Sequence, residues 1–504
     1  MIEQLFLSHY VSFSMSNQLE VLLISMSCKR KEIFTTDTND KLEFSLDTLT
    51  FDTVFTTVGS ATRILKIFNP HKKSIRIDKI SIENGNDSKF RINIDGIPGS
   101  TAENIEIAPE DSLYIFGEVT VNPDQDISIS PFVIEDALIF ETNGNTQKVI
   151  LEAWGQNANY IPNRYYNGKV AYLSCDFGEG VWDDPKPYVI YGVLVVDSCD
   201  LVLPAGMRLY MHGGIAKSEN AAGERYFYND GLIFFLKDGH LKSQGTLDNP
   251  VVIRTDRLEH DFDEVPGQWA GIRFNKGSKG NTINYTEILN SIVAVSVDSA
   301  ASLSIKNSRI GFASGAGILG IHSKIDAENC LIYRTNGNSV QLEYGGEYNF
   351  DYCTMASYGV DETAIRITNL ICRNQLCTRA DNNDLKARFR NSIIFGSRED
   401  EIDIVHAIVD GKDEPFDYKF ENCIYRVKKL PTEEGYMDFF DHSVDCQNAK
   451  TLDPLFFDIE ENDYHLDTLS IAEEKGKPIG INIDLDGNSR DATHPDVGCF
   501  EYSK

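Results

Sequence analysis

Ile305-Lys306-Asn307-Ser308 is the first of five similar phrases that recur along the middle of this chain. The others are Asp326-Ala327-Glu328-Asn329-Cys330, Phe350-Asp351-Tyr352-Cys353, Phe389-Arg390-Asn391-Ser392 and Phe420-Glu421-Asn422-Cys423. Asn329 follows Asn307 by 22 residues, and Tyr352 follows Asn329 by 23. A period near 22 residues with strand-like alternation indicates a solenoid, in which each repeat forms one coil.

A coil of about 22 residues fits three short strands and three bends. Winding the chain supplies the crossover connections that parallel strands need. Asparagine at one bend can adopt left-handed backbone geometry and hydrogen-bond along the stack, and the next residue must then point inward and be small. We therefore interpret these positions as a structural ladder of stacked amides and buried free thiols: Asn307, Asn329, Asn391, Asn422, Cys330, Cys353 and Cys423.

The stretch before this ladder has a characteristic order of motifs. An apolar strand (193–196) is followed by Leu203-Pro204-Ala205-Gly206, a Pro-Val strand (250–253) and Gly267-Gln268-Trp269-Ala270-Gly271-Ile272. This order resembles the right-handed parallel β-helix proteins of the pectate-lyase-like superfamily, most closely surface lipoproteins of gut-type bacteria. The resemblance covers about residues 188–504. It implies a polysaccharide lyase, a glycoside hydrolase or a glycan-binding surface protein.

The last part, from Asp453-Pro454-Leu455-Phe456 to Pro495-Asp496-Val497-Gly498-Cys499-Phe500-Glu501, resembles the segment that closes the final coil in many β-helix proteins. Asp484-Leu485-Asp486-Gly487 within it could ligate Ca²⁺, but the loop lacks the further ligands and the closing Glu of an EF-hand. A turn in which Arg490 pairs with a carboxylate is the favoured interpretation. We expect no cofactor and no metal site, with Ca²⁺ as the open alternative.

Residues 41–156 alternate with a period of two, and Asn-Pro and Asn-Gly turns separate about seven short runs. This pattern predicts a β-sandwich. The phrases 67–70, 75–80 and 108–113 resemble immunoglobulin-like domains of the Hydin and major-sperm-protein type, which implies a stalk or interaction module. The fold class is thus all-β: an N-terminal immunoglobulin-like β-sandwich followed by a right-handed parallel β-helix solenoid.

Five parts are expected along the chain. They are a signal-like segment and tether (1–40), the sandwich (41–156), a connector and cap (157–187), the β-helix (188–436) and its closing segment (437–504). A short apolar run ends at Ser27, directly before Cys28, which resembles a bacterial lipoprotein cleavage site. No Lys or Arg precedes Cys28, whereas secretory signals carry a positive n-region. The expected location is the bacterial outer membrane or cell surface, with Cys28 as the lipidated residue and a disordered tail as the alternative.

The formal net charge of −30 opposes binding to nucleic acid and unassisted docking on anionic lipid. We expect contact with the membrane only through a lipid anchor, a monomeric state, and a polysaccharide or other surface component as partner. Cys372 and Cys377 are close enough in sequence to form a local disulfide, but no second pair supports a metal site there.

The most polar interruption of the β-helix is the segment 254–264, directly before Trp269. Its acids, histidine and arginines suffice for acid–base chemistry or ligand binding, although a solvated loop of mixed charge is the commoner meaning. The candidate ligand-binding residues here are Arg254, Asp256, His260, Asp261, Asp263 and Glu264. Two further breaks in the repeat, after Tyr352 and after Asn391, mark loops where function could lie.

Aromatic residues of the later coils could form a sugar-stacking wall. Tyr333, Arg334 and Tyr344 are the candidates, with packing against the core as the structural alternative. The sequence lacks the polygalacturonase set of Asn-x-Asp, Asp-Asp, Gly-His-Gly and Arg-x-Lys on successive coils, so no catalytic residue is assigned. The function expected from the sequence is a cell-envelope glycan-binding or structural surface protein, with a polysaccharide lyase or glycoside hydrolase as the alternative.

Overall fold

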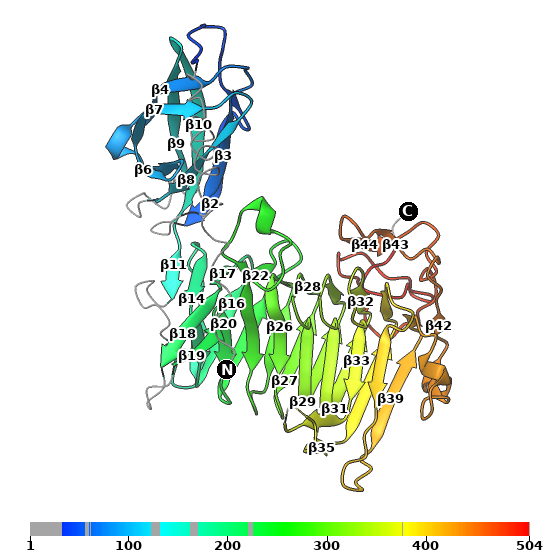
Figure 1. Cartoon of the computed structure of the whole chain (residues 1–504). Coiled ribbons are helices and arrows are strands. Elements are labelled where there is room, and N and C mark those ends of the chain that lie inside the picture. Colours follow the sequence, from blue (N-terminus) through cyan, green and yellow to red (C-terminus); the bar gives the residue numbers. More distant parts are fainter. Residues whose placement is uncertain are drawn as a thin grey trace, which may run out of the picture. The chain divides into compact units, whose positions relative to one another are not determined.

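The structure is a computed structural model, and it describes residues 33–55, 60, 62–121, 132–161, 170–219, 225–374 and 376–502. The chain forms two compact units, and the main division falls between Gln156 and Asn157. Residues 1–32 of the expected signal-like segment and tether (1–40), Cys28 among them, lie outside the described residues. The fold class expected from the sequence is confirmed, because a β-sandwich precedes a parallel β-helix (Figure 1).

The N-terminal unit consists of two five-stranded sheets. One sheet has the order β1 (Glu43–Phe44), β3 (Arg63–Phe68), β8 (Ser112–Val119), β5 (Phe90–Ile94) and β6 (Ile97–Gly99). The other has the order β2 (Thr48–Phe55), β10 (Asn145–Gln156), β9 (Phe132–Thr142), β4 (Ile75–Ile82) and β7 (Thr101–Ile107). Buried and exposed residues alternate along β8, so one side of each sheet supplies the core.

The second unit winds three strands per coil into three parallel ladders. The first ladder contains β12 (Val170–Leu173), β15 (Val193–Val196), β20 (Leu232–Phe235), β23 (Trp269–Phe274), β26 (Ser291–Val297), β29 (Ile318–Glu328), β31 (Val340–Asp351), β33 (Ile365–Thr368) and β38 (Ile402–Val405). β29 and β31 are long enough to turn the corner and serve the second ladder as well.

The second ladder also contains β13 (Gly178–Val181), β16 (Cys199–Pro204), β21 (Gly239–Gln244), β24 (Asn281–Asn284), β27 (Ser302–Lys306), β36 (Leu385–Arg390), β39 (Phe416–Glu421) and β41 (Ser443–Val444). The third contains β11 (Asn159–Ile161), β14 (Tyr188–Tyr191), β17 (Arg208–His212), β22 (Val251–Thr255), β25 (Thr286–Leu289), β28 (Arg309–Gly311), β30 (Leu331–Tyr333), β32 (Thr354–Ser357), β37 (Ile393–Gly396), β40 (Ile424–Tyr425) and β42 (Gln447–Asn448).

The repeated phrase lies at the corner between the second and third ladders. Asn307, Asn329, Asn391 and Asn422 all have left-handed backbone, with φ of 48°, 51°, 49° and 53°. The Asn329 amide nitrogen donates to the Asn307 side-chain oxygen at 3.1 Å. The small residues that follow these corners, among them Cys330, Cys353 and Cys423, are buried free thiols.

The solenoid begins earlier in the chain than the sequence interpretation places it. Residues 170–181, assigned to the cap, form β12 and β13, which pair in parallel with β15 and β16. A disulfide between Cys175 and Cys199 joins this first coil to the next. The polar, glycine-containing sequence of β13 has no apolar alternation, so its pattern gives no sign of a strand.

The end of the solenoid is covered by two short 3₁₀ helices, η4 (Leu430–Thr432) and η5 (Phe439–His442). Phe439 is fully buried, and its ring lies 5.8 Å from that of Phe420 and 5.5 Å from that of Tyr425. These residues cover the apolar core that an open last coil would expose to water.

Residues 449–502 return along the outside of the third ladder (Figure 1). This C-terminal segment includes β43 (Phe456–Asp458) and β44 (Asp463–Leu466). All four residues of β32 and all four of β37 are buried, because the solenoid core lies on one side of these strands and the C-terminal segment on the other. The sequence interpretation assigned residues 437–504 to closing the last coil; residues 439–448 do belong to that coil, as η5, β41 and β42, whereas residues 449–502 lie along the flank.

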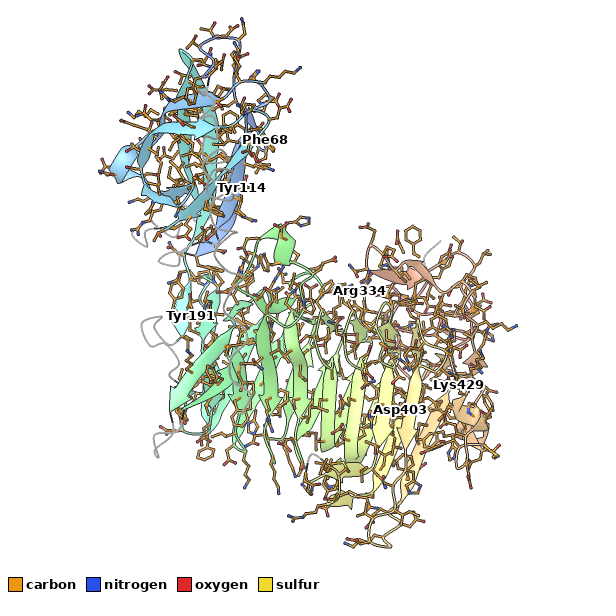
Figure 2. All side chains as sticks on the ribbon, viewed as in Figure 1. Phe68, Tyr114, Tyr191, Arg334, Asp403 and Lys429 are labelled. Atoms are coloured by element: carbon orange, nitrogen blue, oxygen red, sulfur yellow. A yellow bond between two sulfur atoms is a disulfide. The ribbon has the colours of Figure 1, made fainter. Side chains whose placement is uncertain are left out.

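Polar contacts fix the C-terminal segment to several coils. Arg334 donates to the side chain of Asn462 at 2.7 Å and to the backbone oxygen of Ile459 at 2.9 Å (Figure 2). Asn391 exchanges two hydrogen bonds with the backbone of Lys477. The buried guanidinium of Arg490 lies 3.9 Å from the ring centre of Tyr352. The amide ladder thus gives way to contacts with the C-terminal segment at these coils.

The Asp484–Gly487 loop is a hydrogen-bonded turn. The buried Asp484 carboxylate accepts from the backbone N–H groups of Asp486, Asn488 and Glu501. Arg490 pairs with Glu501 at 3.3 Å. The Asp484 carboxylate thus serves as the acceptor for three backbone N–H groups.

Both loops that break the repeat lie between the first and second ladders. The first carries a hairpin of β34 (Leu370–Cys372) and β35 (Ala380–Asn382), with a disulfide between Cys372 and Cys377. The second connects β38 to β39 and contains a bridge between Val409 and Lys412. In both, an insertion lengthens the chain without shifting the strands that follow it.

We predict that Phe389→Ala lowers stability by about 3–5 kcal/mol, because a fully buried ring is replaced by a cavity. Phe389 stacks between Phe350 and Phe420 with ring centres 5.1 Å apart on each side. The shift of the urea-unfolding midpoint measures the effect. The control is Lys324→Ala, which removes a half-exposed ion pair with Glu347 and should cost less than about 1 kcal/mol. Equal shifts in the two variants would contradict this packing.

We predict that the C-terminal segment loosens at alkaline pH. The hydrogen bond to Asp486 chiefly, and that to Asp463, raise the pKa of His465 from 6.5 to about 9 against the opposing effect of burial. Since the folded pKa is raised, this stabilisation is complete below pH 6.5 and is lost as the pH rises through about 9. Amide exchange of residues 455–490 should accelerate across that window. His465→Gln should remove most of the dependence, whereas the exposed His260→Gln should not.

Candidate functional site

A column of side chains forms where three successive strands of the third ladder end. Tyr191 and His212 are register partners at the ends of β14 and β17, and the backbone of Asp256 continues the ladder beyond β22. The rings of Tyr191 and His212 are 4.5 Å apart, and Tyr191 is labelled in Figure 2. His212 Nδ1 and Asp256 Oδ2 are 2.7 Å apart. Parallel strands about 4.8 Å apart bring such positions into contact in every coil.

A hairpin brings a second carboxylate to the same place. After His212 the chain leaves the coil as β18 (Ile215–Glu219) and β19 (Arg225–Asn229) and returns at Asp230. The neck of this hairpin is closed by a hydrogen bond from the Asp230 N–H to the Gly214 oxygen at 2.9 Å. Asp230 Oδ1 is buried and has no hydrogen-bond partner among the described residues.

Gly213 is required at the base of this neck. A Cβ at this position would lie 1.6 Å from the backbone oxygen of Gln268, so only glycine allows the chain to leave the coil here. The close passage places His212 directly beside the segment that carries Gln268.

The opposite wall is the segment 256–268, which contains the 3₁₀ helix η3 (His260–Phe262). The Arg257 guanidinium lies 3.7 Å from the Phe262 ring centre, and its Nε donates to the Glu259 carboxylate. The Gln268 amide nitrogen donates to the backbone oxygens of Phe262 and Val265. These contacts hold the segment in one conformation although it lies outside the ladders.

The hairpin and the segment 256–268 enclose a cleft of about 480 Å³. Its lining includes His212, Asp230, Asp256, Arg257, Gln268 and Trp269. Trp269 is almost fully buried and forms part of the floor, where its ring nitrogen donates to the Leu289 oxygen at 2.7 Å. The cleft therefore combines hydrogen-bond donors and acceptors with apolar surface.

The charged groups in the cleft perturb one another. Burial raises the pKa of the Asp230 carboxyl, against smaller opposing effects of the Gly231 N–H and His212. Burial lowers the pKa of His212. The hydrogen bond and charge of Asp256, together with the charge of Asp230, outweigh burial, so the net shift of this pKa is upward. An acid that holds its proton more tightly beside a histidine–aspartate pair is suited to proton transfer or to binding hydroxyl groups.

Of the six candidates predicted in the segment 254–264, only Asp256 lines this cleft. Arg254 and Asp263 pair with each other at 2.8 Å, and the His260 side chain is 97% exposed. Asp261 lies in η3, and Glu264 accepts a hydrogen bond from Asn462 at 2.8 Å. Most of the segment's charges thus shape the wall and do not face the cleft.

The predicted wall of Tyr333, Arg334 and Tyr344 is not assembled. The Tyr333 ring packs 5.4 Å from that of Tyr464, and burial raises its pKa. Arg334 anchors the C-terminal segment. Tyr344 lies instead between the two halves of β31, close to His322 and Arg373. Tyr333 and Arg334 thus have structural contacts with the C-terminal segment, whereas Tyr344 lies apart from them.

Sequence reasoning missed His212 and Asp230. Aligning the ends of the third-ladder strands would place Tyr191-Gly192 against His212-Gly213 and so bring out the column. No comparable signal marks Asp230, because the hairpin separates it from His212 by 17 residues.

A second hollow, of about 320 Å³, lies on the C-terminal segment and is lined by residues that include His465, Asp463 and Tyr502. Both ring nitrogens of His465 are occupied by carboxylates. Across the described ranges, no three or more His, Cys, Asp or Glu side chains are arranged to hold a metal ion. No helix in the described part of the chain is long and apolar enough to cross a membrane.

No protein-family model matches this sequence, and no curated protein sequence matches it. Among solved structures, a PapD-like domain of human CEP192 is 10% identical, with a TM-score of 0.17, and the match covers 24% of this chain and 88% of that one. A GH87 α-1,3-glucanase from Streptomyces thermodiastaticus is 8% identical, with a TM-score of 0.20, and the match covers 72% of this chain and 73% of that one.

A family 123 glycoside hydrolase from Clostridium perfringens is 6% identical, with a TM-score of 0.19, over 39% of this chain and 48% of that one. Scores at this level carry no argument about the fold or the activity of this chain. Its function must be inferred from its own cleft.

Proposed function

We propose that this chain binds a carbohydrate in the cleft formed by His212, Asp230 and Asp256. The observation that carries the proposal is the buried Asp230 Oδ1, which has no hydrogen-bond partner among the described residues. An unpaired buried acceptor is costly, and a ligand hydroxyl that donates to it removes this cost.

Sugar rings match the remaining chemistry of the cleft. Their hydroxyl groups both donate and accept, so they can pair with the guanidinium of Arg257 and with the carboxyl groups of Asp230 and Asp256. Their C–H faces are apolar, which suits contact with Phe262 and Ile292 on the walls.

A second candidate function is hydrolysis or lyase cleavage of the bound polysaccharide. It is favoured by the raised pKa of Asp230 beside the His212–Asp256 pair, since a carboxylic acid that keeps its proton can act as a general acid. The two candidates share one site and differ only in whether the ligand is consumed.

We predict that Asp230→Ala weakens carbohydrate binding by about tenfold to a hundredfold, the usual loss for a hydrogen bond to a charged group. Affinity gels across a panel of neutral and acidic polysaccharides identify the ligand, and calorimetry measures the loss. His240→Ala is the control. His240 pairs with Asp200 at 2.6 Å, as His212 pairs with Asp256 in the cleft, but His240 does not line the cleft. Binding that survives Asp230→Ala, or that falls equally in the control, would refute the proposed site.

For the catalytic candidate, we predict that the ligand identified in the gels gains new reducing ends or unsaturated ends during incubation with the protein. Asp230→Asn should stop this release while retaining binding, because the amide preserves shape but cannot donate a proton as an acid. The rate should fall as the pH rises through the raised pKa of Asp230, since only the protonated form acts. A ligand that binds and is recovered intact at every pH would leave binding as the function.

A further inference from the structure

The last coil extends the column of small inward residues beyond the point where the repeated phrase ends. Asp445 has the left-handed backbone of the ladder positions, with φ of 52°, and Cys446 follows it. Asp445-Cys446 therefore occupies the place that Asn422-Cys423 occupies one coil earlier. The sequence hides this relation because an aspartate stands where the asparagine is expected.

Strand register brings the two cysteines together. Ile424 pairs with Gln447, so the residues directly before them, Cys423 and Cys446, lie at equivalent positions on neighbouring coils. The Cys423 N–H donates to Cys446 Sγ at 3.3 Å, so the Cys446 thiol lies directly beside the Cys423 backbone. Equivalent positions on neighbouring parallel strands are about 4.8 Å apart, which is inside the Cα–Cα range of disulfides.

The pair differs in accessibility from the other stacked thiols. Cys330, Cys353 and Cys499 are fully buried, whereas Cys446 is only partly buried on the last coil. The hydrogen bond from Cys423 lowers the pKa of the Cys446 thiol despite the opposing effect of burial. Cys446 is thus the thiol that an external oxidant can reach, and Cys423 is the thiol placed to complete the reaction.

We propose that Cys423 and Cys446 form a third disulfide that ties the last coil to the one before it. The oxidant is a disulfide of the surroundings, small or protein-borne. The Cys446 thiolate attacks one sulfur of that disulfide and displaces the other as a thiolate, giving a mixed disulfide. Cys423 then loses its proton and attacks Cys446 Sγ, which releases the second thiol of the oxidant. Two thiols of the chain are oxidised, and the oxidant is reduced to two thiols.

The bond would act at the last coil, where the strand pairing is short. The strand pairing between the last coil and its neighbour runs through β41 and β42, which are two residues each. Among the described residues no further coil follows it, so a covalent link there limits fraying more than one in the middle of the stack. The inference is independent of carbohydrate binding, because the pair does not line the cleft at Asp230.

Oxidised glutathione, added to the folded, reduced protein, is the test. Free thiols are then alkylated, the chain is digested, and linked peptides are identified by mass. Besides the Cys175–Cys199 and Cys372–Cys377 links, we expect one new peptide pair joined through Cys423 and Cys446, with Cys330, Cys353 and Cys499 recovered as alkylated thiols. Amide exchange of residues 436–448 should slow on oxidation, and dithiothreitol should reverse both effects.

Cys446→Ser should abolish the linked pair, and Cys330→Ser is the matched control that should retain it, because Cys330 occupies the same column in a middle coil. Two outcomes overturn the proposal. One is recovery of Cys423 and Cys446 as separate alkylated thiols after oxidation. The other is a stable glutathione adduct on Cys446 with no link to Cys423.

Discussion

Every feature of the solenoid depends on the register between its parallel strands. Because each coil repeats the backbone of the previous one, a position on one strand has an equivalent position in the neighbouring coils. Inside, this stacks Phe350, Phe389 and Phe420 into one column. At the corner, it aligns asparagines and small residues. Outside, it sets Tyr191, His212 and Asp256 in a row. The core, the corner and the row of side chains beside the cleft are three results of the same geometric constraint.

The cleft also needs two walls, which the register of the strands alone does not supply. Equivalent positions lie on one line and cannot surround a ligand. The hairpin after His212 and the segment 256–268 leave the coil on neighbouring turns and provide two walls, and Gly213 lets the first of them depart beside the backbone of Gln268. Asp230 lies where the hairpin returns to the coil. Its carboxyl is half-buried there because the returning chain enters the cleft, which is already lined by apolar and backbone groups.

The sequence predicted what repeats and missed what does not. The period of the phrase around Asn307 and Asn329 predicted the solenoid, since every coil needs similar residues at the same corner. The Cys372–Cys377 disulfide, an open alternative at that stage, is present because the two residues lie close in sequence. Asp230, the contacts of Arg334 with Asn462, and the disulfide of Cys175 with Cys199 all join residues that no local pattern connects. Such contacts depend on where insertions and the returning C-terminal segment lie in space, which periodicity does not encode.

The returning C-terminal segment changes how the solenoid assembles and comes apart. A stack of coils held only by nearest neighbours can grow and fray one coil at a time. Here Asp486 contacts Arg309, Asn462 contacts Arg334, and Lys477 contacts Asn391, so one segment binds coils that are not adjacent. We therefore expect those coils to fold and unfold together. Because the segment follows all the coils in the chain, the apolar side of β32 and β37 stays uncovered until the segment itself has been synthesised and has docked.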